Sequence, residues 1–450
     1  MNVAVIGAGR AGLIAAAGLA DFGMRVRCVD IDETKIAALT RGSVPFHEPG
    51  LMELLDKNRK ADRLHFSTDL AEAVEKCLVL FIAVGTEEVA PGKANLAPLF
   101  AVTRGIAKSL REYRVLVIKS TVPVGTAKAV LAELGRLTPI VCDVVSNPEF
   151  LREGSAIENF LRPDRVILGG NSEQALAVVR DIYRPLYLIE TPIFTTDHET
   201  AELIKYATNA YLALKITFIN EIANLCDAIG SDVHTVAKAL GSDKRIGPKF
   251  LHPGPGFGGS CLPKDTRVLV NTGEQYGVNL RTVAAALETN YFQCRDVLNK
   301  LKNVLGSLEG RTICVLGLAY KPSTDDVRES RAMDFVGLLL EEGATVQAHD
   351  PAANGAAAAL LQHERLNFFN DPYEAASGAD ALAVLTEWNE FRALGPTMLK
   401  RAMRGAVLLD VRNVFVPEAI AAAGFLYLGR GRGAKLSVSV PEISNAVASR

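Results

Sequence analysis

The chain has 450 residues, about three times the length of a typical domain, which predicts two or three domains. Hydrophobic residues make up 49% of it and charged residues 22%, a composition that excludes a disordered or fibrous protein. The 49 Lys and Arg residues and 51 Asp and Glu residues leave a net charge of -2, so we expect neither nucleic acid nor an anionic membrane as a partner. A small anionic ligand is compatible with this balance.

The N-terminus and the cysteines indicate the expected compartment. The first residues form a short apolar strand before Gly7, without the basic and apolar regions of a signal peptide, and no window reaches the roughly eighteen consecutive apolar residues of a membrane span. We therefore expect a cytoplasmic protein. The seven cysteines form no Cys-x-x-Cys pair, which predicts neither a disulfide framework nor a metal site. Five of them have apolar neighbours and are expected in the core: Cys28, Cys77, Cys142, Cys226 and Cys314.

The first half of the chain alternates runs rich in β-branched residues with helical stretches, which predicts a parallel sheet with helices on both faces. The expected strands are 3–6, 26–29, 79–84, 115–118, 141–145 and 166–168. From 198 to 229 there is neither Gly nor Pro, and apolar residues recur at helical spacing, so we expect one helix of roughly 50 Å. Residues 196–199 (Thr-Asp-His-Glu) form a capping box at its start, and Gly230 ends it.

A second alternating region begins near residue 311, with expected strands at 312–316, 345–350, 381–385 and 406–409. The sequence thus predicts an α/β protein of two Rossmann-like, doubly wound lobes joined by a central helical domain with a long helix. We place the domains at residues 1–197, 198–300 and 301–450. Glycines alternate with arginines from 429 to 433, which is typical of a mobile loop.

A glycine-rich turn follows the first strand. Gly7, Gly9 and Gly12 have the Gly-x-Gly-x-x-Gly spacing and precede a helical run, so the backbone can approach a pyrophosphate at a helix N-terminus. Asp30 ends the second strand, where a carboxylate binds ribose and disfavours a 2′-phosphate. The first lobe is therefore predicted to bind NAD rather than NADP. Lys35 is either a contact to the adenosine end of this cofactor or an ordinary surface lysine.

The second lobe has a different turn after its first strand. Residues 317–321 lack the three-glycine spacing. We infer that this turn binds a different phosphate ligand, with Lys321 or Arg328 as the positive partner. A lobe kept only for structure is the alternative.

Cys261 stands in a segment, 254–265, that holds too many glycines and prolines for a regular helix or strand. Such a loop brings the backbone close to a ligand and presents the thiol, whose thiolate fraction Lys264 would raise. Alone, this residue is equally well an inert loop thiol. With an NAD site in the same chain, it predicts a thiolate that traps an aldehyde formed by hydride transfer and passes it to a second oxidation.

Polar residues on the long helix and at strand ends are further candidates. Lys205 and Asn209 share one helix face and can donate hydrogen bonds to an oxygen that gains negative charge, although a solvated face is the simpler interpretation of their spacing. Glu149 and Glu153 follow an expected strand and are either proton carriers or helix N-terminal acids. Thr121 ends another strand, where it can position water or the nicotinamide ribose.

Together these motifs resemble the UDP-glucose/GDP-mannose dehydrogenase family over residues 1–413. The similar segments, in order, are the dinucleotide turn, 120–126, 147–154, 163–165, 202–209, 220–221, 244–251, 256–265 and 317–330. Residues 150–157 and the segment around Arg245 are most similar to the UDP-glucose branch. The resemblance implies NAD binding by residues 1–197, dimerisation and catalysis by 198–300, and UDP-sugar binding by 301–450.

The resemblance implies a reaction in which C6 of UDP-glucose is oxidised twice with NAD, giving UDP-glucuronate. Cys261 would form a thiohemiacetal and then a thioester. Lys205 and Asn209 would stabilise oxyanions, and Asp265 and Thr121 would hold the catalytic water. Glu153 would support thioester hydrolysis, and Glu149 would lie beside Glu153 at the sugar.

The resemblance also implies the binding residues. Those for the UDP-sugar are Glu149, Phe150, Leu151, Arg152, Glu153, Lys205, Asn209, Arg245, Phe250, Leu251, His252, Pro253, Gly254, Gly258 and Lys321. Those for NAD, beyond the glycine turn, Asp30 and Lys35, are Thr86, Thr121, Glu153, Lys264 and Arg328. The resemblance further implies a homodimer with the long helix at its core, in which Arg245 enters the neighbouring subunit's site.

Two positions depart from the family pattern. Glu87 and Glu88 stand after Thr86 where the family has Pro, and Leu262 replaces an aromatic residue after the cysteine. The first departure weakens the inference about the cofactor loop, and the second weakens the inference about the sugar. Neither departure touches the proposed chemistry. The alternatives are the same chemistry on GDP-mannose or a UDP-N-acetylhexosamine, and a non-catalytic regulator that binds NAD and a nucleotide sugar and in which Cys261 is inert.

Overall fold

The computed structural model describes residues 1–433, which form two compact units. The first comprises Met1–Tyr211 and Lys264–Ala284, and the second comprises Leu212–Pro263 and the described residues from Ala285 onward. The divisions fall inside three helices: α9 (His198–Ile229), α11 (Leu262–Gln275) and α12 (Arg281–Leu305). Each unit has its own sheet and its own hydrophobic core.

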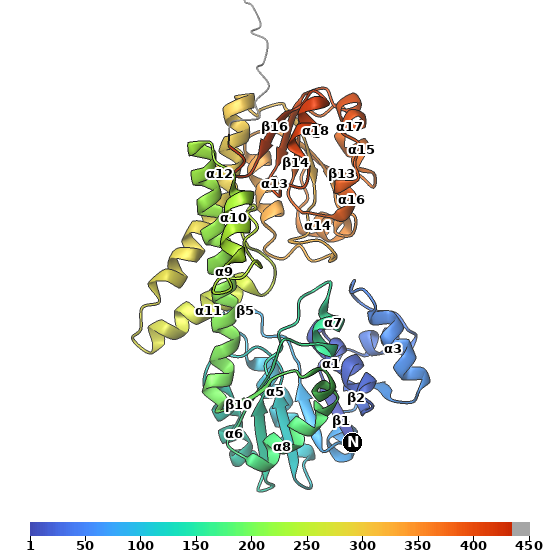
Figure 1. The fold of residues 1–450 in the computed structure, drawn as a ribbon. Helices are drawn as coiled ribbons and strands as arrows, with labels where there is room; N and C mark the ends of the chain where they lie inside the picture. The colour runs from blue at the N-terminus through green and yellow to red at the C-terminus, as the bar shows by residue number, and fades with distance from the viewer. Residues whose placement is uncertain (434–450) are drawn as a thin grey trace, which may run out of the picture. The chain divides into compact units, whose positions relative to one another are not determined.

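The first unit contains an eight-stranded sheet in the order β10-β9-β8-β7-β4-β1-β2-β3 (Figure 1). Its strands are β1 (Asn2–Ile6), β2 (Arg25–Val29), β3 (Leu64–Ser67), β4 (Val79–Ile82), β7 (Arg114–Ile118), β8 (Cys142–Ser146), β9 (Val166–Gly169) and β10 (Ile193–Thr196). Six strands are parallel, as predicted, but β9 pairs antiparallel with β8 and carries β10 with it. The prediction of a wholly parallel sheet was therefore wrong at this edge, because a β-branched run indicates a strand but not its direction.

Helices cover both faces of this sheet, as its apolar strands require. Val3 and Val5 of β1 belong to the core under α1, whereas Ala4 and Ile6 belong to the core on the opposite face. Strands buried on both faces have nearly continuous apolar sequences. This is why the alternation of strands and helices could be recognised in the sequence. The helices and the 3-10 helix of this part are α1 (Arg10–Asp21), α2 (Glu33–Thr40), α3 (Leu51–Lys60), α4 (Leu70–Lys76), α5 (Ala97–Ser109), α6 (Thr126–Leu137), α7 (Ala156–Leu161), α8 (Glu173–Ile182) and η1 (Arg184–Ile189). A small hairpin, β5 (Glu88–Ala90) and β6 (Lys93–Ala94), follows β4.

The second unit holds a six-stranded parallel sheet in the order β13-β12-β11-β14-β15-β16. Its strands are β11 (Thr312–Leu316), β12 (Thr345–His349), β13 (Leu366–Phe368), β14 (Ala381–Val384), β15 (Val407–Asp410) and β16 (Leu426–Gly429). Its helices after α12 are α13 (Arg331–Glu341), α14 (Asn354–Leu360), α15 (Pro372–Ala376), α16 (Asn389–Arg392), α17 (Pro396–Ala402) and α18 (Pro417–Ala422). The prediction of two Rossmann-like lobes is confirmed.

The long helix α9 has the predicted length, but its cap differs from the prediction. Asp197 Oδ1 accepts a hydrogen bond from the amide of Thr200 at 2.7 Å, so Asp197 caps the helix rather than Thr196. Both residues are capping types, and their side chains alone do not decide between adjacent starts. Gly230 follows with φ +74°, the left-handed conformation that ends helices. The shorter helix α10 (Val233–Ser242) comes next.

Two segments that the sequence predicts to be irregular or mobile differ from that prediction in the structure. Helix α11 begins at Leu262, so the last residues of 254–265 are helical. Pro263 is tolerated there because the first helical turn has no partner for its missing N–H. The segment 429–433 is not a mobile loop: Arg430 is 3% exposed, its backbone exchanges hydrogen bonds with Asn413, and Arg432 pairs with Asp232 at 3.0 Å.

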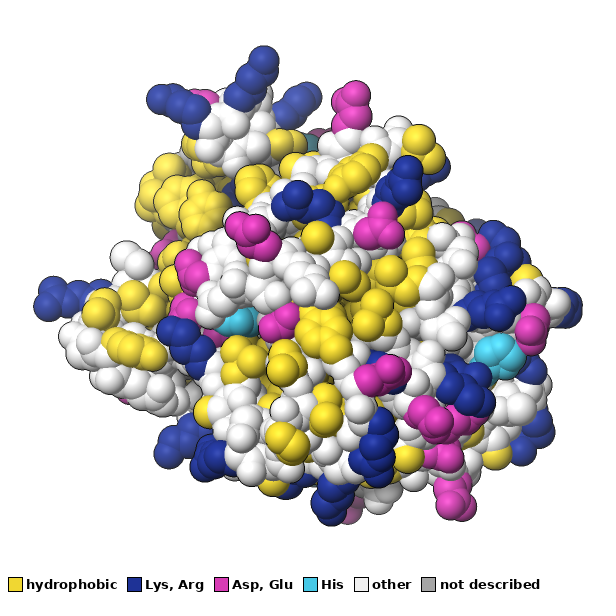
Figure 2. Space-filling view, turned by 90° about the horizontal axis from the view of Figure 1, so that it is seen from below, with side chains coloured by type: hydrophobic (Ala, Val, Ile, Leu, Met, Phe, Trp, Pro, Cys, Tyr) yellow, Lys and Arg dark blue, Asp and Glu magenta, His cyan; other side chains and the backbone are white. Residues whose placement is uncertain are grey.

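Side chains of both charge signs are interspersed on the face that Figure 2 shows, without a field of one sign. Among residues 1–433, no helix is both long and apolar enough to cross a membrane. The same part of the chain holds no group of three or more His, Cys, Asp or Glu side chains placed to bind a metal ion.

Candidate active site

The glycine turn after β1 forms a cradle that is open at one point. Gly7 has φ +105°, and a Cβ on Gly12 would lie 1.8 Å from the carbonyl oxygen of Gly7. A Cβ on Gly9, by contrast, would meet nothing within 4 Å. Gly9 is also the N-cap of α1 and supplies no side-chain partner for the helix amides. The open space at Gly9 and a helix N-terminus without a side-chain cap fit a pyrophosphate.

Asp30 lies beside this turn at the end of β2. Its Oδ2 accepts a hydrogen bond from the amide of Ala8 at 2.7 Å, and its Oδ1 accepts one from the amide of Asp32 at 3.0 Å. Lys35 Nζ lies 3.2 Å from Oδ2, so this lysine is paired with the predicted ribose carboxylate rather than simply solvated. Burial acts to raise the pKa of Asp30, but these hydrogen bonds and Lys35 hold it below its ordinary value. The carboxylate is therefore ionised and directed to where a ribose would lie.

Lys205 and Glu149 form a buried ion pair. Lys205 Nζ lies 3.0 Å from Glu149 Oε1, and Glu149 Oε2 accepts a hydrogen bond from the amide of Leu151 at 2.5 Å. Burial acts to raise the pKa of Glu149, but the Lys205 charge and the Leu151 amide hold it below its usual range. Two cations lie near the Phe150 ring: the Arg165 guanidinium is 3.7 Å and Lys205 Nζ is 5.4 Å from its centroid. This arrangement fixes the ammonium group.

Asn209 lies one turn further along α9 and contacts α11. Its Nδ2 donates to Asp265 Oδ2 at 2.6 Å, and Lys264 Nζ binds the other oxygen of the same carboxylate. Lys205 and Asn209 are only 3% and 7% exposed, so the simpler interpretation of a solvated helix face was wrong. A cation, an amide and a carboxylate thus converge within the first unit, and they can stabilise an oxyanion and hold a water molecule.

Thr121 lies in a turn that is held from two sides. Thr86 Oγ1 donates to the backbone oxygen of Thr121 at 2.7 Å. A cavity of about 10 Å³, enough for about one water, is lined by Thr121, Glu202 and Lys205, among others. Glu202 accepts hydrogen bonds from the amides of Gly125 at 2.6 Å and Ala127 at 2.8 Å, and burial raises its pKa to about 7. Sequence reasoning missed Glu202, although its spacing of three from Lys205 places both on one helix face.

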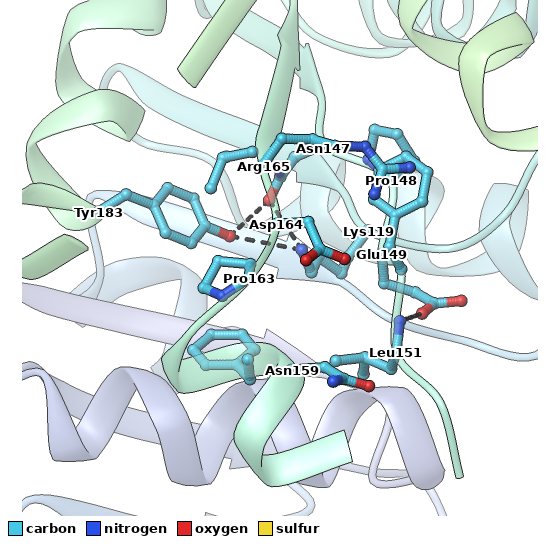
Figure 3. Close-up of a pocket in the computed structure, with 13 residues that line it drawn as sticks. Lys119, Asn147, Pro148, Glu149, Leu151, Asn159, Pro163, Asp164, Arg165 and Tyr183 are labelled. Carbon is cyan, nitrogen blue, oxygen red and sulfur yellow. Dashed lines mark hydrogen bonds between the residues drawn. The ribbon is translucent and has the colours of Figure 1, made fainter. Parts of the chain in front are cut away.

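A second cavity, of about 40 Å³, lies behind Glu149 (Figure 3). Lys119 Nζ donates to Asn147 Oδ1 at 3.1 Å, and the Tyr183 hydroxyl donates to the same oxygen at 2.6 Å. Figure 3 shows both groups pointing at the Asn147 side chain. Burial lowers the pKa of Lys119 to about 8, although the Glu149 charge opposes this. Lys119 was also missed, and its signal was a lysine that directly follows a buried apolar strand.

The loop from Glu149 to Gly154 is anchored at its far end. Glu48 accepts hydrogen bonds from the amides of Gly154 at 2.8 Å and Ala156 at 2.7 Å. Arg10 Nη1 lies 3.8 Å from Glu153 Oε2. Because α7 begins only at Ala156, Glu149 and Glu153 do not belong to its first turn. In the same loop, Arg152 is exposed and binds Asn159 Oδ1 through its amide and its Nε.

Cys261 is exposed, whereas the other six cysteines of the chain are buried or half-buried. Two asparagine side chains on helices of the second unit hold the loop that precedes Cys261. Asn220 Oδ1 accepts a hydrogen bond from the backbone amide of Gly254 at 2.8 Å, and Asn290 Oδ1 accepts one from the backbone amide of Phe257 at 2.7 Å. A Cβ on Gly258 would lie 2.3 Å from the carbonyl oxygen of Glu329. The glycines therefore allow this loop to pack against the segment that carries Lys321 and Arg328.

The remaining predicted substrate residues also lie in the second unit. Phe250 has φ +65°, Leu251, Pro253 and Gly254 are buried, and His252 is exposed. A Cβ on Gly254 would lie 2.5 Å from Nη1 of Arg412, a cation that sequence reasoning missed. Lys321 Nζ lies 5.4 Å above the Tyr320 ring, and Arg328 binds both oxygens of Asp326. Arg245 has an 89% exposed side chain that pairs with Asp243 at 2.6 Å.

The turn of the second lobe is built differently from the glycine turn of the first. Asp350 ends β12, as Asp30 ends β2, but its Oδ2 accepts hydrogen bonds from the amides of both Leu318 and Ala319. Trp388 Nε1 donates to the same oxygen at 3.1 Å. Helix α13 begins only at Arg331, so no helix N-terminus follows this turn directly. The second lobe therefore lacks the turn–helix arrangement that binds a pyrophosphate in the first.

Family models cover almost the whole chain. The NAD binding domain of the UDP-glucose/GDP-mannose dehydrogenase family matches residues 1–187, the central domain matches 199–291, and the UDP binding domain matches 314–417. Both lobes and the helical middle are thus represented in one family.

Individual relatives are similar over their full length. The chain is 47% identical over 437 residues to a UDP-glucose 6-dehydrogenase of Rhizobium meliloti, covering 96% of this chain and 100% of that protein, and 44% identical to one of Bacillus subtilis, covering 96% and 94%. Among solved structures, a UDP-glucose dehydrogenase of Pyrobaculum islandicum has a TM-score of 0.89 at 37% identity, covering 96% of this chain and 97% of that one. A UDP-D-ManNAc dehydrogenase of Pyrococcus horikoshii has a TM-score of 0.84 at 26% identity, covering 96% and 99%.

Proposed function

This chain belongs to the UDP-glucose/GDP-mannose dehydrogenase family, and on that premise we propose that it is a UDP-glucose 6-dehydrogenase, which oxidises UDP-glucose to UDP-glucuronate. The observation that carries the proposal is the buried pair of contacts on one face of α9, Lys205 with Glu149 and Asn209 with Asp265. This set supplies both the cation and the water-holding carboxylate that a two-step oxidation to an acid needs.

The cofactor is NAD, and the first unit fits it. The turn at Gly9 would receive the pyrophosphate, and the ionised carboxylate of Asp30 would bind the adenosine ribose. Thr86, Lys264 and Arg328 would complete the cofactor site. When bound, NAD⁺ accepts a hydride from C6 of the sugar in each of the two oxidations.

In the first oxidation, the C6 hydride passes to NAD⁺ and the O6 proton passes to water, so negative charge develops on O6 in the transition state. Lys205 Nζ and Asn209 Nδ2 would donate hydrogen bonds to this oxygen. Glu149 pairs with Lys205 in a buried position, and Phe150 limits the movement of the ammonium group. The roles of these residues are to orient the alcohol and to stabilise charge.

The second oxidation requires a covalent adduct. The Cys261 thiol would add to the aldehyde, with an S–C6 bond formed and the thiol proton transferred to O6. Loss of the second hydride from C6 and of the O6 proton leaves a thioester. A water held by Asp265 and Thr121 would attack this carbonyl while Glu153 takes its proton. The C6–S bond then breaks, which releases the carboxylate and restores the thiol.

We assign the nucleotide sugar to the loops of the second unit. The backbone of 250–254 and Gly258 would line the site, with Lys321 and Arg412 near the diphosphate. For the sugar itself we propose residues 150–152. The domain division proposed from the sequence, 1–197, 198–300 and 301–450, is supported by the positions of the three family domains.

We also assign a homodimer whose core includes α9. Large apolar side chains along this helix are strongly exposed in the single chain: Leu203, Tyr211, Phe218, Leu225 and Ile229. They recur at spacings of seven, eight and four residues, so they form one stripe, and a stripe of this kind marks an interface. The exposed Arg245 would reach the neighbouring subunit's site.

The decisive experiment counts NADH formed per sugar nucleotide consumed. The full-length enzyme is expected to form two NADH for each UDP-glucose and to release UDP-glucuronate. GDP-mannose and UDP-N-acetylmannosamine, tested in parallel, should support much slower turnover. One NADH per sugar would refute the two-step oxidation, and a preference for either competitor would refute the sugar assignment. Ligand binding without any turnover would instead indicate a regulator.

A further inference from the structure

The β5–β6 hairpin connects two parts of the site. It begins two residues after Thr86, at the position where Glu87 and Glu88 replace the family's proline. Thr86 Oγ1 donates to the Thr121 oxygen, so the first end of the loop is tied to the turn that follows β7. The backbone amide of Asn95 donates to the backbone oxygen of Glu87 at 2.8 Å, which closes the loop at its other end.

Glu88 binds Arg267 of α11 in a forked ion pair. Arg267 Nε lies 3.2 Å from Glu88 Oε1 and 3.1 Å from Oε2, and its Nη2 lies 2.5 Å from Oε2. The two side chains are only 15% and 27% exposed. Glu88 Oε1 also accepts a hydrogen bond from the amide of Gly92 at the hairpin tip, at 2.7 Å. Forked, charge-assisted contacts of this kind fix orientation as well as distance.

A second contact joins the hairpin tip to the same helix. Asn271, one turn beyond Arg267, donates from Nδ2 to the backbone oxygen of Gly92 at 2.7 Å. Gly92 has φ +75°, and a Cβ there would lie 3.1 Å from Asn271 Cβ and 3.2 Å from the Arg267 oxygen. Only glycine allows the tip to lie this close to α11. The hairpin is therefore held on the helix at two successive turns.

This helix carries residues of the site at its start. Lys264 and Asp265 lie in the first turn of α11, just before Arg267. Tyr206, between Lys205 and Asn209, is 1% exposed, and its hydroxyl has no hydrogen-bond partner among the described residues. Burial raises its pKa well above the usual range, and the charges of Asp265, Glu202 and Glu88 act in the same direction. Glu88 therefore shares one electrostatic environment with Asp265.

We propose that Glu88 is a positioning residue, whose ion pair with Arg267 holds the Thr86 loop against α11 and fixes the spacing between Thr86 and Lys264. The inference rests on the proposed function, which assigns NAD to both of these residues. Because the pair acts on the loop that carries Thr86, its loss weakens NAD binding and leaves UDP-glucose binding nearly unchanged. A pair that served only folding would not separate the two ligands.

The test uses the full-length chain with Glu88→Gln, Arg267→Gln and the double variant. NAD⁺ titrations give the Kd for NAD⁺. Steady-state kinetics with varied NAD⁺ and varied UDP-glucose give the KM for each of them. Each single variant should raise the Kd and KM for NAD⁺ about tenfold, with the KM for UDP-glucose within about twofold of wild type. The double variant should lose no more than the worse single variant, because the two residues act as one unit.

The matched control is Lys57→Gln, which breaks the Lys57–Asp21 ion pair of 2.6 Å in the same unit. It should leave both NAD⁺ constants unchanged. The proposal is overturned by wild-type NAD⁺ affinity in both single variants, by equal losses for both ligands, or by losses that multiply in the double variant. The titration needs no turnover, so it remains informative if wild type fails to oxidise UDP-glucose, a result that would refute the proposed function separately.

Discussion

Asn209 donates a hydrogen bond to Asp265 at 2.6 Å and thereby ties the middle of α9 to the first turn of α11. Lys264 binds the remaining oxygen of Asp265, whose side chain is 1% exposed. A buried carboxylate with both oxygens occupied is held in one orientation. The residue proposed to hold the hydrolytic water is therefore positioned before any substrate binds.

Asp265→Asn should slow the last step selectively. The asparagine can still accept the Asn209 hydrogen bond through its oxygen, but it loses the charge that orients and activates water. We expect kcat to fall about a hundredfold, because the water that attacks the thioester is no longer held in place. The thioester should then accumulate and be visible as a mass increase of Cys261 in the intact protein. The double variant with Cys261→Ser should show no such adduct, and unchanged turnover of Asp265→Asn would contradict its role.

Cys261→Ser should nearly abolish UDP-glucuronate formation and leave UDP-glucose and NAD⁺ affinities largely intact, because the hydroxyl is a much weaker nucleophile than the thiolate. Product is measured by chromatography and affinity by titration. Cys142→Ser is the matched control, since Cys142 is a half-buried thiol with no proposed role. Normal turnover of the Cys261 variant would remove the covalent mechanism.

Gly9→Ala and Gly12→Ala should separate cofactor binding from folding. A methyl group on Gly9 meets no protein atom within 4 Å but occupies the space proposed for the pyrophosphate, so NAD⁺ affinity should fall at least about tenfold with an unchanged unfolding temperature. A methyl group on Gly12 collides with the Gly7 oxygen, so this variant should unfold at a lower temperature. Calorimetry and NAD⁺ titration measure the two effects. Wild-type NAD⁺ affinity in Gly9→Ala would argue against the proposed phosphate position.

Glu202 should make stability depend on pH. Its folded-state pKa, about 7, lies above the ordinary glutamate value because the side chain is buried. The folded state therefore binds the proton more tightly, so this contribution to stability is full below the ordinary value and is lost as pH rises through about 7. The loss amounts to at most about 3 kcal/mol. Relative to wild type, Glu202→Gln should unfold at a progressively higher temperature between pH 5 and pH 8; a constant difference between the two proteins would contradict this assignment.

Phe218→Glu should weaken the proposed homodimer. Phe218 is 49% exposed on the apolar stripe of α9, and a charge there would have to be buried against a second subunit. Light scattering after chromatography should show a concentration-dependent shift toward monomer. Leu360→Glu on α14 is the control, because Leu360 is equally apolar and 60% exposed but lies outside the stripe. An unchanged dimer in the Phe218 variant would move the interface elsewhere.

Local signals predicted the elements well and the cofactor turn best. The strand, the three glycines and Asp30 all act through short-range backbone geometry, so their spacing between a strand and a helix predicts a dinucleotide turn. The long helix was equally visible, because 32 residues without Gly or Pro leave few alternatives. The direction of β9 and the exact cap of α9 depended on tertiary pairing, which periodicity does not report.

Residues that act through distant partners were harder to recognise. The spacing of Lys205 and Asn209 fitted a solvated surface as well as a site, and only packing against Glu149 and Asp265 distinguishes the two. Lys119 and Glu202 gave no motif, because each is defined by backbone and side-chain groups far away in sequence. Glu88 was noticed only as a departure, and its partner Arg267 lies 179 residues away.

The contacts of segment 429–433 determine where the chain can be truncated or fused to another protein. Arg430 is buried against Gln293 of α12, and Arg432 is bound to Asp232 just before α10. A deletion that begins at 429 would leave Asp232 without its cation and open a hole beside α12, whereas a cut after Gly433 keeps every one of these contacts. Affinity tags, fusion partners and crystallisation variants are best joined beyond this residue.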